Sequence, residues 1–204
     1  GDKDRVRTGL ALHAAAGHEG IDVDLSGYPA AQAMMRQLGA VEAGMIADEM
    51  ALRRGLTADE AEMVHARLSA PDGPEPDHPL RLELLGRAAL AQGRAKEAEA
   101  YGARLATSEP ERSAGFLLLS EAAMAQIGDD PEMALHAGNL ARLAAGRDRT
   151  DPRPLIMYYR IALAAGEAPD ERAKVALEAA YDMAGSDPRY RLLLTRHLLS
   201  LGRT

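Results

Sequence analysis

The sequence predicts an all-α fold, a stack of helix pairs, from its composition, its glycine spacing and its helix-capping residues. Of 204 residues, 47% are hydrophobic, yet Trp and Cys are absent and Phe occurs once. A core therefore has to be built from Ala, Leu and Met, which are strong helix formers. Residues that favour strands are scarce by comparison.

Glycines recur at a nearly constant spacing. Each predicted helical run ends at one of them, at intervals of 38, 35, 38 and 36 residues: Gly55, Gly93, Gly128, Gly166 and Gly202. A period of this length is typical of helical repeat proteins. An alanine opens the next run after each of the first four glycines, at Ala61, Ala98, Ala134 and Ala173. The repeat is therefore helix, glycine turn, helix, because glycine best tolerates the left-handed residue that ends many helices.

Capping residues mark the predicted helix starts. Thr57 with Glu60 and Ser108 with Glu111 have the spacing of a capping box. An aspartate precedes a proline at 130–131, 151–152 and 187–188, which suits an N-cap followed by the first helical residue. These boundaries predict helix pairs at about 41–70, 79–108, 112–147 and 152–185, and a last helix at about 188–201.

Two stretches differ from the repeats. Residues 1–40 form a lead-in with helical and loop character, ahead of the repeats in 41–204. Residues 69–79 are rich in proline and acidic residues, which predicts either a linker between subdomains or a long loop between helix pairs. The last helix is rich in leucine and has no partner helix after it. This favours a missing continuation or a self-association surface, so a homo-oligomer through the C-terminal helix is expected.

Charge and hydropathy exclude several classes of function. The net charge is −7, and residues 1–78 carry 14 acids against 7 bases, while residues 79–204 are balanced at 17 each. An acidic chain with few aromatic residues is not expected to bind nucleic acid. No apolar run reaches membrane-span length, and residues 1–25 have no signal-peptide pattern, although a leader could have been removed. The compartment, cytoplasmic or exported, is left open.

One helix pair resembles a known repeat family. From Pro79 onward the chain is similar to a tetratricopeptide repeat, whose pattern is W-x2-L-G-x2-Y, then A-x3-F, then P over 34 residues. The matching positions are Leu82, Leu85, Gly86, Ala89, Ala98 and Pro110. Gly102 replaces the expected aromatic residue, and the helix pairs are longer than the family's 34 residues. The resemblance implies an α-α superhelix, a right-handed solenoid of helix-turn-helix repeats with a concave groove that holds a peptide or protein segment.

The resemblance also implies a set of groove residues. In this family the first helix of each pair lines the groove, and its second and ninth positions map to arginines in three pairs: Arg87, Arg153, Arg160, Arg189 and Arg196. Arginine binds carboxylates in a bidentate manner, so such a row suits an acidic peptide or a chain terminus. The alternative is that these arginines lie on solvated helix faces and pair locally with Glu or Asp.

No catalytic residue, metal site or cofactor is expected. His13 and His18 are five apart, whereas zinc-binding histidines on a helix are four apart. Asp22 and Asp24 begin a D-x-D pattern without the Gly and Glu that complete a calcium loop. Phosphate-binding glycine loops and a nucleophile elbow are absent from the sequence.

The sequence therefore predicts a non-catalytic protein–protein interaction scaffold. Two alternatives remain: a helical accessory region of a larger enzyme, or a helical receptor for a small anionic ligand.

Overall fold

The computed structural model describes residues 57–70, 75–128 and 130–184, together with residues 192, 194, 195, 198 and 199. Within these residues there are seven α-helices and no strand, which confirms the predicted all-α class. The lead-in of residues 1–40 and the start of the first predicted helix pair lie outside the described residues. Of the predicted last helix, only the five separate residues just named are described, and all five are helical.

The chain divides into two compact units, an N-terminal unit of residues 1–92 and a C-terminal unit of residues 93–204. In the N-terminal unit, α4 (Ala58–Leu68) contacts α5 (Pro79–Ala91). Arg81 on α5 donates from Nε to the Leu68 carbonyl at the end of α4, at 2.8 Å. The buried residues of these two helices are almost all aliphatic: Ala61, Val64, Leu68, Leu82, Leu84, Leu85, Ala88 and Ala89.

The start of α4 confirms one predicted capping box. The Thr57 amide donates to the Glu60 carboxylate at 2.9 Å, and the Glu60 amide donates back to the Thr57 hydroxyl at 3.3 Å. Two backbone donors that have no partner within the helix are satisfied in this way. The helix therefore begins where the sequence predicts.

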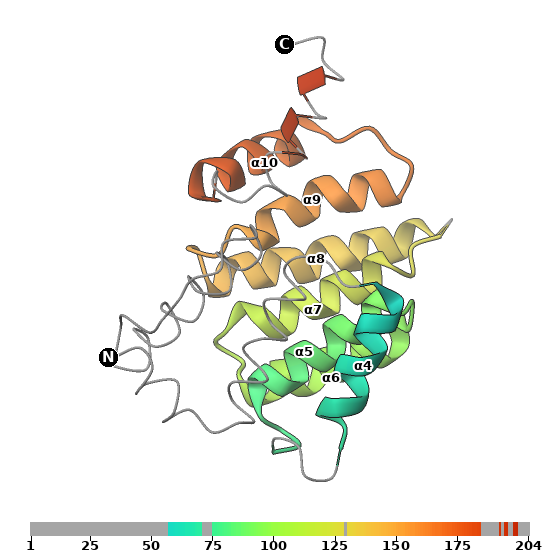
Figure 1. Cartoon of the computed structure of the whole chain (residues 1–204). Helices are drawn as coiled ribbons and strands as arrows, with labels where there is room; N and C mark the ends of the chain where they lie inside the picture. The colour runs from blue at the N-terminus through green and yellow to red at the C-terminus, as the bar shows by residue number, and fades with distance from the viewer. Residues whose placement is uncertain are drawn as a thin grey trace, which may run out of the picture. The chain divides into compact units, whose positions relative to one another are not determined.

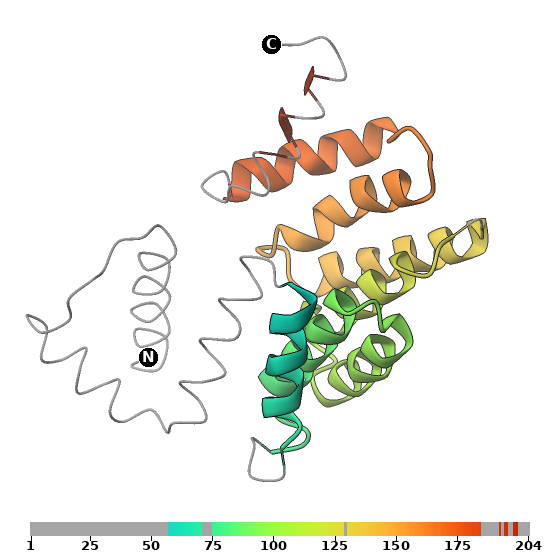
Figure 2. The same ribbon diagram turned by 45° about the vertical axis from the view of Figure 1, so that its right-hand side comes forward.

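In residues 93–184, where only residue 129 is not described, the C-terminal unit has five helices that pack in chain order: α6 (Ala95–Ser108), α7 (Ser113–Met124), α8 (Pro131–Arg147), α9 (Arg153–Ala164) and α10 (Glu171–Ala184). Each helix contacts the next one along the chain, and α7 also contacts α9. Figures 1 and 2 show α8, α9 and α10 following one another in this order. The helices α7 and α8 fall within the predicted pair 112–147, and α9 and α10 fall within 152–185.

Two apolar clusters hold the C-terminal unit together. The larger joins α7, α8 and α9 through Leu117, Ala123, Ile127, Ala137, Leu140, Ala141, Ala144, Met157 and Ile161. The smaller joins α9 and α10 through Ile156, Tyr159, Ala173, Leu177 and Ala180, with Leu194 packed against it. The helix α9 contributes to both clusters, because its apolar residues point to opposite sides.

The predicted glycine turns are confirmed at three positions. Gly93, Gly128 and Gly166 have φ angles of 71°, 49° and 71°, in the left-handed region. After α9 the Glu167 amide donates to the Ala162 carbonyl at 2.9 Å and the Gly166 amide to the Leu163 carbonyl at 3.1 Å. These two bonds form a Schellman motif, which ends the helix and turns the chain toward α10. The other two glycines of the series, Gly55 and Gly202, lie outside the described residues.

Glycine also permits the close approach of α6 and α7. A Cβ atom at Gly115 would lie 2.5 Å from the backbone nitrogen of Ala106, and one at Gly102 would lie 3.0 Å from Leu119 Cγ. Ala106 near the end of α6 lies against Gly115 near the start of α7, and the earlier Gly102 lies against the later Leu119. The two helices are therefore antiparallel. A larger side chain at Gly102 would meet Leu119.

The helix α7 is buried on most sides. Its buried residues are Ser113, Gly115, Leu117, Leu118, Ser120, Ala122 and Ala123. The fully buried Ser120 hydroxyl donates to the Ala137 carbonyl on α8 at 2.8 Å, so this polar group does not remain unpaired. A helix that is apolar nearly all round is typical of a position inside a core.

One predicted cap is corrected. The capping box predicted at Ser108 and Glu111 is wrong: Ser108 is the last residue of α6, its hydroxyl donates to the Leu105 carbonyl at 3.1 Å, and Arg112 precedes α7. The helix α9 begins at Arg153, within one residue of the predicted start. Asp130 caps α8 as predicted by accepting from the Glu132 amide at 2.9 Å. The Asp-Pro pair at 187–188 lies outside the described residues.

Candidate functional site

Three of the five predicted groove arginines are described. Arg87 lies on α5 in the N-terminal unit, and Arg153 and Arg160 lie on α9 in the C-terminal unit. Arg189 and Arg196 lie outside the described residues. Each of the three described arginines has a carboxylate of the same unit beside it, but the three pairs differ in geometry.

Arg87 pairs with Glu83 one turn earlier on α5. Its Nη2 lies 3.0 Å from Glu83 Oε1, and its Nε donates to the same oxygen at 3.1 Å. Both side chains are mostly buried, at 23% and 20% exposed. This is the local pairing expected of neighbouring charges on a helix surface.

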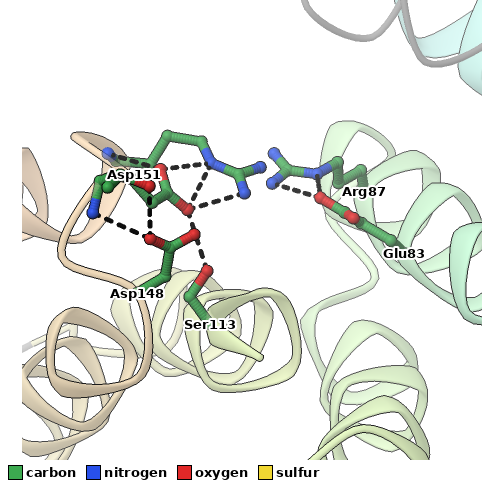
Figure 3. A network of polar contacts seen from close by, with 7 residues as sticks. Glu83, Arg87, Ser113, Asp148 and Asp151 are labelled. Atoms are coloured by element: carbon green, nitrogen blue, oxygen red, sulfur yellow. Dashed lines mark hydrogen bonds and ion pairs between the residues drawn. The ribbon is translucent and has the colours of Figure 1, made fainter. Parts of the chain in front are cut away.

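Arg153 is held by a fork of two hydrogen bonds to Asp151. Its Nε donates to Oδ1 at 2.9 Å and its Nη2 donates to Oδ2 at 2.8 Å. Asp151 also accepts from the Arg153 backbone amide at 3.0 Å, so it caps α9, and from the Ser113 hydroxyl at 3.0 Å. Figure 3 shows this network between the start of α7 and the chain before α9. A carboxylate of the chain itself therefore occupies the bidentate face of Arg153.

The surroundings of Asp151 keep its carboxylate charged. Burial alone would raise its pKa, but the hydrogen bonds and charge of Arg153, together with the Ser113 bond, outweigh burial, so the pKa of Asp151 lies below its usual value. Nearby, the Asp148 carboxylate accepts from the Thr150 hydroxyl and amide at 2.7 and 2.8 Å, which lowers the pKa of Asp148. The two aspartates thus order the connection between α8 and α9.

Arg160 has a looser environment. Its Nη1 lies 3.7 Å from Glu121 Oε1 on α7 and 3.8 Å from Met157 Sδ. The Arg160 side chain is 39% exposed, whereas that of Glu121 is 13% exposed. At this separation the contact is an ion pair without a close hydrogen bond.

Glu121 is a site residue that the sequence reasoning missed. It lies seven residues before Gly128, whereas Arg87 and Arg160 each lie six residues before the glycine that follows their helix. The glycine register points to Ala122 in this pair, so it does not find Glu121. The structure nevertheless places Glu121 Oε1 3.7 Å from Arg160 Nη1.

A second cation also lies near the start of α7. The Arg147 guanidinium, at the end of α8, lies 5.6 Å from the Phe116 ring centroid, and its Nη1 is 3.1 Å from Glu111 Oε2. An arginine over an aromatic face is attracted by the ring's negative π-surface. Residues near the start of α7 therefore contact both ends of the α8–α9 connection: Phe116 contacts Arg147, and Ser113 bonds to Asp151.

Among the described residues, no group of three or more histidines, aspartates or glutamates is arranged to hold a metal ion. His65, His78 and His136 lie on or next to three different helices, α4, α5 and α8. His13, His18, Asp22 and Asp24 lie outside the described residues. No helix in the described part of the chain has both the length and the apolar character needed to cross a bilayer.

Comparisons with known protein families, curated proteins and solved structures give no match to this chain. The similarity to tetratricopeptide repeats is therefore still a prediction that depends on the residues named above.

Proposed function

We propose that the chain is a non-catalytic interaction scaffold, whose helix pairs build a tetratricopeptide-like right-handed superhelix that binds a peptide or protein segment. The contact between α7 and α9 is the observation that carries the proposal. These are the first helices of two consecutive predicted pairs, and α8 lies between them in the sequence. Neighbouring first helices lie side by side in helix-pair repeats, and together they provide the lining of a groove.

The residues at the ends of these two helices fit a binding surface. Ala125 after α7 and Ala164 at the end of α9 are exposed, and Leu163 is 51% exposed. Arg160 lies one turn before Leu163, and its guanidinium lies 3.7 Å from the Glu121 carboxylate and 3.8 Å from the Met157 sulfur, so both contacts are long. A segment that lies across α7 and α9 would meet an apolar side chain beside a cation, which suits a peptide with an acidic and an apolar residue.

The test uses two groove variants and one matched control. A pull-down from a lysate of the source organism identifies a candidate partner, and calorimetry then measures its affinity for purified wild-type and variant chains. Arg160→Ala and Leu163→Ala are expected to weaken binding, by about tenfold each if both side chains are contacted. Arg172→Ala is expected to leave affinity unchanged, because Arg172 is exposed on α10. Equal affinities for all four chains would exclude this surface as the binding site.

A further inference from the structure

The helices α7 and α9 face each other with matching patterns. On α7, Ser113, Leu117 and Glu121 are four residues apart, so they lie along one face. Ser113 bonds to Asp151 two residues before α9, and Glu121 pairs with Arg160. The second polar contact lies further along both helices than the first, so the helices run parallel. Leu117 of α7 and Met157 of α9 both belong to the larger apolar cluster and lie, in sequence, between the two polar contacts.

The first polar contact, here called the hinge contact, consists of Ser113 and Asp151. Ser113 is 5% exposed, and the Asp151 side chain is 7% exposed. The bond is 3.0 Å long, and the same carboxylate caps α9 and binds Arg153. Breaking the hinge contact would remove this bond from the buried Ser113 hydroxyl, which is costly, although Asp151 would keep its bonds to Arg153.

The second polar contact, here called the latch contact, consists of Glu121 and Arg160. Its charged atoms are 3.7 Å apart, and Arg160 is 39% exposed. Water and salt can therefore screen the pair, and exposed ion pairs of this kind contribute little to stability. The two contacts at either side of the apolar core thus differ greatly in strength.

We infer that α9 pivots on α7 about Ser113 and Asp151, and that the Glu121–Arg160 pair sets the separation of the two helices at their C-terminal ends. Salt, or a carboxylate that competes for Arg160, opens this end while the other stays closed. Met157 and Ile161 remain in the shared core, which limits the motion to a small rotation. The inference concerns the chain's own conformation and holds whether or not the proposed peptide binding is correct.

The chain has no native cysteine, so pairs of spin labels can be attached at chosen exposed positions. One pair, Arg112→Cys with Arg149→Cys, lies next to the hinge contact. The other, Ala125→Cys with Ala164→Cys, lies beyond the latch contact. Dipolar broadening in electron paramagnetic resonance spectra then reports the label separation at each end.

With Arg160→Gln, the Ala125–Ala164 pair is expected to show weaker dipolar broadening, because even a small rotation moves these labels apart, and the Arg112–Arg149 pair is expected to keep its broadening unchanged. The same split is expected for the otherwise unchanged chain in about 1 M salt, where the Debye length is roughly 3 Å. The salt experiment therefore tests the inference even if the Arg160→Gln chain fails to fold. The matched control, Arg172→Gln on α10, is expected to change neither pair.

The inference is wrong if the Ala125–Ala164 pair is unaffected by both Arg160→Gln and salt. It is also wrong if both label pairs change equally, or if Arg172→Gln has the same effect as Arg160→Gln. Peptide affinity does not enter these measurements, so their failure is distinct from a failure of the proposed function.

Discussion

Ser113 and Asp151 are 38 residues apart in the sequence, yet the Ser113 hydroxyl donates to the Asp151 carboxylate at 3.0 Å. The same carboxylate caps α9 and binds the Arg153 guanidinium. One acidic side chain therefore joins the starts of two helices that belong to consecutive predicted pairs. Its contribution can be measured, because each of its partners is known.

Asp151→Asn is expected to lower the free energy of unfolding by about 1 to 3 kcal/mol, since hydrogen bonds to charged groups are stronger than neutral ones. The substitution keeps the shape of the side chain but removes the charge that faces Arg153. Urea denaturation followed by circular dichroism measures the loss. Asp148→Asn is the control, because Asp148 bonds only within its own loop and a smaller loss is expected. Equal losses for the two variants would contradict the special role of Asp151.

Acid is expected to destabilise the fold partly through Asp151. Its folded-state pKa lies below the unfolded value of about 3.9, so the unfolded chain binds more protons in acid. The stability that this carboxylate provides is fully present above the unfolded pKa and is lost as pH falls through the lower, folded pKa. Urea midpoints from about pH 5 downward should therefore fall less steeply for Asp151→Asn than for wild type. Parallel curves for the two chains would contradict this assignment.

The features that the sequence predicts well are local ones. Alanine and leucine content predicts helices, and the glycines at 93, 128 and 166 end them with the expected left-handed backbone. The Thr57 and Asp130 caps are also confirmed, because each cap depends on residues within one turn. Ser108 shows the limit of such reasoning: its spacing to Glu111 fits a capping box, but Ser108 is the last residue of α6 and does not begin a helix.

The contacts between helices were harder to predict. Nothing in the spacing of Ser113 and Asp151 identifies them as partners, because their bond depends on how α7 and α9 pack. Arg87, Arg153 and Arg160 lie on α5 and α9, and their carboxylate partners were considered only as a general alternative. Glu121 was missed for the same reason, because the glycine register points to Ala122 in its pair and the contact with Arg160 depends on packing. Distances and exposure distinguish the tightly held Arg153 from the loosely held Arg160.

Gly166→Ala is expected to destabilise the C-terminal unit by about 1 to 2 kcal/mol. The left-handed backbone conformation is less favourable by this amount for a residue that has a Cβ atom. Gly166 has a φ of 71°, and no atom lies within 4 Å of an added Cβ, so backbone strain is the dominant cost. Gly166→Asn should lose less stability, since asparagine tolerates this conformation better. Thermal unfolding of the two variants compares them directly. An alanine variant as stable as wild type would show that the turn can change its conformation at little cost.

Gly115→Ala and Gly138→Ala are expected to have opposite effects, although both add one methyl group to a helical glycine. At Gly115 the new Cβ would lie 2.5 Å from the Ala106 nitrogen and 2.6 Å from its Cα. Backbone atoms cannot rotate away, so α6 and α7 would have to separate, at a cost of about 1 to 3 kcal/mol. At Gly138 on α8 no atom lies within 4 Å, and alanine should stabilise the helix by about 0.5 to 1 kcal/mol. Urea denaturation of both chains measures the two changes, and a stabilising Gly115→Ala would mean that α6 and α7 are not in such close contact in solution.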